Sequence, residues 1–212
     1  MRTDDLIGAL VADHAPSRLR FARIFALSLA AAAVVAALAF FAFIGVRSDF
    51  GSAAQSLRFL TKFAVTLSLL AAGAGLLRRL ATPGADLRYW RFAPLLALLV
   101  LAVAVVLELF AAPASSWSAR LVGLNAQACL AVIPLLAIGP LAILLLALRR
   151  GAPSRPALAG AVAGLVAGAL AATFYATHCQ DDSPLFVAVW YSLAIGFVTL
   201  AGSALGSRLL RW

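Results

Sequence analysis

Six long apolar runs, separated by short polar segments, dominate this chain of 212 residues. The residues are 64% hydrophobic and only 12% charged, whereas a soluble domain is about half apolar and a quarter charged. Most of the runs reach the roughly 20 residues that a helix needs to cross about 30 Å of hydrocarbon. The sequence therefore argues against a water-soluble fold and predicts six membrane spans, at residues 24–46, 63–77, 92–112, 121–148, 157–176 and 185–205.

The pattern within the runs favours helices over the strands of a barrel. Each run is continuous and rich in Ala and Leu, without the alternation of apolar and polar residues that barrel strands show. The first run is longer than the apolar part of a signal peptide and lacks a convincing cleavage site after it, so we interpret it as a span. We expect an all-α membrane protein, a six-transmembrane-helix bundle, with residues 1–23 as a tail and residues 24–212 as one domain.

Basic residues are distributed unequally between the two sides of the predicted bundle. Of the 17 Lys and Arg residues, 13 lie in the tail, the second and fourth loops and the C-terminus, and four lie in the other loops: Arg47, Arg58, Lys62 and Arg120. Basic residues are enriched on the cytoplasmic side, so both termini are predicted to be cytoplasmic, in a bacterial inner membrane. We therefore interpret the formal charge of +9 as a topology signal and expect no direct nucleic-acid contact.

Small and helix-breaking residues predict how the spans pack. Gly160, Gly164 and Gly168 form a stripe on the fifth span that allows a neighbouring backbone to approach closely. The stripe fits an interface inside the bundle as well as it fits a homo-oligomer. Pro134 and Pro140 are expected to kink the fourth span.

The few side chains that could bind a metal ion or react chemically lie on the side opposite the termini. They are Glu108, Cys129, His178, Cys179, Asp181 and Asp182. Thiolate, imidazole and carboxylate groups are ligands for soft and borderline metal ions, and two thiols at one depth can instead form a disulfide. We single out Cys129, Cys179 and His178 as candidate metal ligands.

Several of these residues also have a purely structural interpretation. Cys129 would then be a small apolar filler between helices, and Glu108 would extend its carboxylate to the lipid headgroups. Asp182 or Ser183, followed by Pro184, resembles the cap of a helix. Both interpretations stay open at this point.

The tail offers a second candidate site. Thr3 is a candidate cap for a short helix whose first turn carries Asp4 and Asp5, which suit the helix dipole. Four apolar residues then share one face: Leu6, Ile7, Leu10 and Val11. Because a helix of about ten residues is marginal alone, we expect it to lie on the membrane surface or in a groove of a protein partner.

Two segments, together with the six spans, resemble the NrsF family of proteobacterial anti-sigma factors. They are MRTDDLI at residues 1–7 and, most specifically, YATHCQDDSPLFVAVWY at residues 175–191. The resemblance implies that the tail holds an extracytoplasmic-function sigma factor inactive at the membrane, with Asp4, Asp5 and Leu6 matching the family's tail motif. The tail is very short for such a module, so cytoplasmic loops are expected to contribute.

The resemblance also implies that Cys129 and Cys179 match the family's paired cysteines, which take part in sensing an outside stress. Residues 24–212 would then be a sensor domain. We expect no resident cofactor, only a soft metal ion as a transient signal, or an oxidant. Our hypothesis is that the signal engages both thiols, shifts the fourth span against the fifth and sixth, and lowers the affinity for the sigma factor.

Two other classes of membrane protein compete with this interpretation. A small six-helix transporter or channel is the main alternative, but the polar groups in the middles of the spans are scattered hydroxyls such as Thr66 and Ser68. A thiol oxidoreductase would need a dithiol close in sequence and usually a second pair. The sequence shows no recognisable hydrolase or phosphate-binding motif, so we predict that the protein is not an enzyme.

Overall fold

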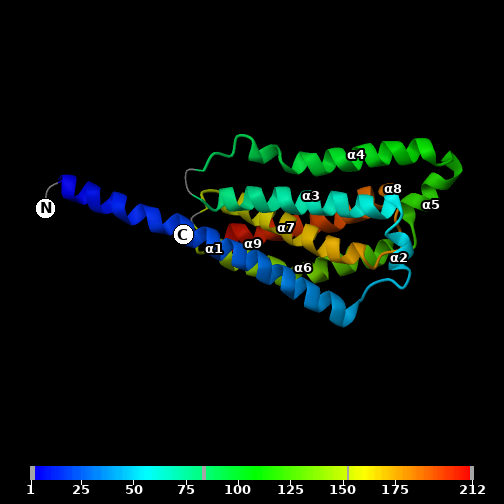
Figure 1. Cartoon of the computed structure of the whole chain (residues 1–212), viewed down its shortest axis with the longest axis horizontal. Helices are drawn as coiled ribbons and strands as arrows, with labels where there is room; N and C mark the ends of the chain where they lie inside the picture. The colour runs from blue at the N-terminus through cyan, green and yellow to red at the C-terminus, as the bar shows by residue number, and fades with distance from the viewer. Residues whose placement is uncertain (1–2, 83–84, 152, 211–212) are drawn as a thin grey trace.

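The protein is a bundle of helices, six of which are long and apolar enough to cross a membrane (Figure 1). The computed structural model describes residues 3–82, 85–151 and 153–210, and these residues form no strand. The elements are α1 Thr3–Phe43, α2 Phe50–Ala53, α3 Leu57–Leu80, η1 Trp90–Phe92, α4 Pro94–Ala111, η2 Ala114–Ser116, α5 Trp117–Val122, α6 Ala126–Leu148, α7 Pro156–Ala176, α8 Pro184–Phe186, η3 Val187–Tyr191 and α9 Ser192–Leu209. The predicted fold class is confirmed. Six crossings place both termini on one side of the bundle, called the termini side below.

The second span starts earlier than its apolar run. Ser56 caps α3 by accepting a hydrogen bond from the Phe59 N–H at 3.4 Å, so the helix includes Lys62. The helix then has 24 residues, which is enough to cross the hydrocarbon. Lys62 is thereby a residue of the span and no longer of the loop before it.

The fourth apolar run is broken where the sequence predicted one continuous span. Residues 117–122 form the short helix α5, and Gly123 then turns the chain with a φ of 59°, a conformation that favours glycine. The long helix α6 begins only at Ala126 and continues through Pro134 and Pro140. Cys129 therefore lies in the first turn of α6.

The first helix is a single element of 41 residues, not a short tail helix followed by a separate span. Its apolar part is Ala22–Phe43, and the preceding part extends beyond the bundle in Figure 1. At 1.5 Å per residue, residues 3–21 add about 28 Å of helix. The structure differs from the expected short helix because the apolar part already supplies a helical nucleus, from which the tail can propagate.

The core of the bundle is α7, which packs against α9, α3 and α6. A methyl group on Gly160 would lie 2.3 Å from the carbonyl oxygen of Gly202, and one on Gly164 would lie 2.4 Å from that of Val198. The glycine stripe is therefore occupied by α9 of the same chain. In this structure it serves an internal interface.

Candidate functional site: a buried thiol pair at an anchored loop

The two cysteines lie together on the side of the bundle opposite the termini. Cys129 is in α6, and Cys179 is in the connecting loop of residues 177–183 between α7 and α8. Both are free thiols and both are fully buried. The hydrogen bond from Cys129 is the largest influence on the pKa of Cys179, which is lowered; burial opposes this shift and the charge of Lys62 adds to it. The structure thus brings the two predicted sensor residues into contact.

Two basic side chains anchor the connecting loop. Lys62, on α3, is fully buried; its Nζ donates to the Cys179 carbonyl at 2.9 Å and pairs with Asp182 at 2.5 Å. Arg47, just after α1, donates to the same carbonyl at 3.2 Å and pairs with Asp182 at 3.1 Å. Arg47 also binds Asp49 at 2.6 Å and lowers the pKa of that carboxyl. The Cys179 carbonyl and the Asp182 carboxylate are therefore each held by both cations, which come from different parts of the chain.

The connecting loop is also tied directly to the segment that follows α1. The backbone N–H of Arg47 donates to the Thr177 carbonyl at 3.2 Å, and Nδ1 of His178 lies 3.0 Å from the Gly45 carbonyl. The structure therefore directs His178 toward the end of α1. Among the described residues, no group of three or more His, Cys, Asp and Glu side chains is placed to hold a metal ion.

Asp181 and Ser183 have structural partners at helix starts. The Asp181 carboxylate accepts hydrogen bonds from the Asn125 N–H at 2.8 Å and the Leu124 N–H at 3.0 Å, immediately before α6. Ser183 caps α8 by accepting from the Leu185 N–H at 3.3 Å, as its capping interpretation predicts. Asp181 thereby joins the connecting loop to the helix that carries Cys129.

Glu108 belongs to a separate ion-pair cluster. It is 5% exposed and accepts hydrogen bonds from Arg58 and Arg120, each at 2.8 Å. These residues come from α4, α3 and α5, so the cluster joins three elements. The interpretation that Glu108 extends to the lipid headgroups was wrong, because two cations neutralise it within the bundle.

Two tyrosine hydroxyls lie next to the thiols, and the sequence analysis did not single them out. Tyr175 and Tyr191 are buried, and neither hydroxyl has a hydrogen-bond partner of normal geometry within the described residues. The Tyr175 hydroxyl lies beside Cys129, and the Tyr191 hydroxyl lies beside Cys179. Tyr191 ends the π-helical turn η3, a feature that is frequent at functional sites. Their positions sixteen residues apart in the sequence gave no sign that the two rings lie together, with their centroids 6.1 Å apart.

Lys62 was also missed, because the sequence analysis counted it only as a topology signal. An ionisable residue at the edge of an apolar run is a default candidate for function. That rule applied to Lys62 would have identified it.

The tail side chains Asp4, Leu6, Ile7 and Leu10 lie outside the described residues. The backbone around them is helical, and Asp5 is exposed. On a continuous helix, Leu6 and Leu10 are about one turn apart. The role of these residues stays a prediction.

Comparison with known proteins identifies relatives over the full chain. The family described as "Negative regulator of sigma F", NrsF, matches residues 10–212. The chain is 35% identical over 220 residues to the "Anti-sigma-F factor NrsF" of Caulobacter vibrioides (strain NA1000 / CB15N), with 100% of both chains covered. It is 33% identical over 219 residues to the "Probable anti-sigma-F factor NrsF" of Azospira oryzae, again with 100% of both covered. No solved structure matches.

Proposed function

Because this chain belongs to the NrsF family of negative regulators of sigma F, a family of regulators and not of enzymes, we propose that it is an integral-membrane anti-sigma factor of the bacterial inner membrane. It sequesters an extracytoplasmic-function sigma factor on the termini side. It releases this partner when a periplasmic heavy metal or oxidant reaches the thiol pair. The six apolar helices support the membrane location.

The observation that carries the sensing proposal is that Cys129 and Cys179, the second of them in the connecting loop, are buried beside each other. A soft divalent ion can replace the two thiol protons and bind both sulfurs. This exchange leaves the charge of the site unchanged, with Lys62 still balanced by Asp182. Alternatively, hydrogen peroxide can accept two electrons and both thiol protons, giving two waters as the S–S bond forms.

The contacts of the connecting loop support a route from the thiols to the tail. The loop is joined to Gly45 and Arg47, which follow α1 directly, and α1 is one helix from Phe43 back to Thr3. A change in the loop therefore acts on the end of a continuous rod whose other end carries the tail. Weakening the sigma complex tenfold requires only about 1.4 kcal/mol. In this route the signal acts on α1 as well as shifting the fourth span against the fifth and sixth.

The thiol sensor is tested with Cys129→Ser and Cys179→Ser, singly and together. We expect each variant to keep repression in unstressed cells and to lose most of the induction of the sigma-dependent promoter by cadmium or peroxide. Ser207→Ala, in a partly exposed position of α9, is the control and should respond normally. Immunoblots of membranes establish equal protein levels. Full induction in the double variant would eliminate the thiol pair as the sensor.

The tail is tested by substituting its acidic and apolar residues. Asp4→Ala combined with Leu6→Ala is expected to reduce capture of the sigma factor by the detergent-solubilised chain by about tenfold or more. Truncating two side chains that anchor an interface commonly weakens binding by more than about 1.4 kcal/mol in total. Gln180→Ala, exposed at the end of the bundle opposite the termini, is the control. Undiminished capture by the tail variant would assign sigma binding to the loops instead.

A further inference from the structure

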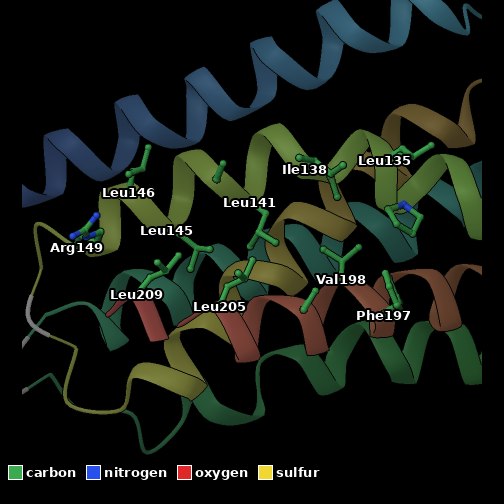
Figure 2. Close-up of a pocket in the computed structure, with 14 residues that line it drawn as sticks. Leu135, Ile138, Leu141, Leu145, Leu146, Arg149, Phe197, Val198, Leu205 and Leu209 are labelled. Carbon is green, nitrogen blue, oxygen red and sulfur yellow. The ribbon is translucent and has the colours of Figure 1, made fainter. Parts of the chain in front are cut away.

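An apolar groove runs between α6 and α9 on the outer surface of the bundle (Figure 2). It has a volume of about 540 Å³, and its walls are mostly leucine, isoleucine, alanine and phenylalanine side chains. Both walls belong to helices that can span a membrane, so the groove faces the hydrocarbon. Water cannot fill such a site stably, because its walls offer almost no polar partners.

One charged residue, Arg149, lines the groove and stands at its termini-side end (Figure 2). Arg149 follows the last residue of α6, where the helix reaches the edge of the membrane. Its side chain is exposed, and no ion pair forms between it and an acid within the described part of the chain. An arginine at this depth suits the phosphate of a lipid headgroup.

The length of the groove suits an acyl chain. Its walls on α6 extend from Arg149 back to Pro134, which is fifteen residues or about 22 Å along the helix axis. One leaflet contributes about half of the roughly 30 Å hydrocarbon core. A chain that starts at Arg149 can therefore stay in the groove over its whole leaflet.

A helix of a second copy fits this groove poorly. Close helix contacts in membranes depend on small residues. Two of the three glycines of α9, Gly202 and Gly206, are already packed against α7, and the third, Gly196, does not line the groove. The groove is instead bordered by large side chains, including Leu141, Leu205 and Phe197. A flexible hydrocarbon chain can follow such an uneven surface.

We propose that this groove binds one phospholipid of the termini-side leaflet, with an acyl chain between α6 and α9 and its phosphate at Arg149. The bound lipid bridges the helix that carries Cys129 and the last span. The proposal rests on the groove and on Arg149 and does not depend on sigma binding or on the thiols.

The test counts retained lipids on the full chain. The protein is reconstituted with palmitoyl-oleoyl-phosphatidylglycerol, extracted into mild detergent and measured by native mass spectrometry. One retained phospholipid per chain is expected. Arg149→Gln is expected to weaken retention about five-fold, the effect of one cation near an anionic headgroup. Arg150→Gln, an exposed neighbour outside the groove, should retain the lipid.

A second pair of variants blocks the groove itself. Ala201→Phe fills it and should abolish retention, whereas Ala204→Phe, on an exposed part of α9 outside it, should not. Circular dichroism establishes that both variants are equally helical. The proposal is overturned if the wild type retains no more lipid than Ala201→Phe, if Arg150→Gln loses as much as Arg149→Gln, or if the spectrum shows a lipid-free dimer.

Discussion

At the scale of single residues, Lys62 is the most informative side chain. It is fully buried, yet it forms an ion pair with Asp182 and donates a hydrogen bond to the Cys179 carbonyl. A buried ion pair contributes little net stability, but removal of one partner leaves the other uncompensated. Lys62 therefore holds the connecting loop in place, and this loop carries Cys179 with its thiol buried.

Lys62→Met is expected to expose Cys179. The substitution removes the hydrogen bond from a charged donor to the Cys179 carbonyl, a contribution of about 1.5–3 kcal/mol. Arg47 still donates to that carbonyl and still pairs with Asp182, which limits the loss. Alkylation of Cys179 by N-ethylmaleimide, measured in a Cys129→Ser background, should become about tenfold faster.

Arg58→Met is the control for this experiment. Arg58 lies one turn earlier on α3 and pairs with Glu108, away from the thiols. Its loss should leave the alkylation rate of Cys179 unchanged. Equal rates in wild type and Lys62→Met would show that the loop is held without the lysine.

At the scale of elements, the contact between α7 and α9 determines how the last two spans meet. Gly164 allows the backbone of α9 to approach so closely that a methyl group would lie 2.4 Å from the Val198 carbonyl oxygen. Helix association in lipid depends on such packing, because lipid supplies no hydrophobic drive between spans. Direct backbone contact here takes the place of interlocking side chains.

Gly164→Ala is expected to destabilise the bundle by about 1–3 kcal/mol, since the added methyl group has backbone and no flexible side chain against it. Thermal unfolding in detergent measures the effect. Gly196→Ala, on α9 with nothing within 4 Å of the new methyl group, is the matched control and should be neutral or slightly stabilising. A Gly164→Ala protein as stable as Gly196→Ala would show that the two helices separate easily.

At the scale of the whole molecule, charge divides the bundle into two different ends. Five ion pairs lie opposite the termini, and they involve each of the four basic residues on that side: Arg47, Arg58, Lys62 and Arg120. These charges hold the fold together. Most of the remaining arginines lie on the termini side, as expected if this side is the cytoplasmic one that we propose.

The orientation is tested with single cysteines in a chain that lacks Cys129 and Cys179. The native Cys179 is unsuitable because it is buried, whereas Gln180 and Ser154 are exposed at opposite ends. A membrane-impermeant maleimide should label Gln180→Cys in intact cells and Ser154→Cys only after lysis. The reverse pattern would place the termini outside and end the proposed sigma-binding role.

The sequence alone determined the class of fold. Runs of about 20 apolar residues can satisfy their backbone groups in lipid only as helices, so the number of spans and their approximate bounds followed from composition along the chain. The glycine stripe likewise predicted a close helix contact. Such features are local, or repeat along one helix, and can be read without knowing what lies beside them.

The tertiary structure alone decided which residues meet. The stripe on α7 acquired a partner, Cys129 and Cys179 came into contact, and Lys62 reached Asp182 across more than a hundred residues. It also joined the tail to the first span as one helix. These outcomes depend on the rotation and depth of each helix against its neighbours, which side-chain packing sets and no single segment encodes.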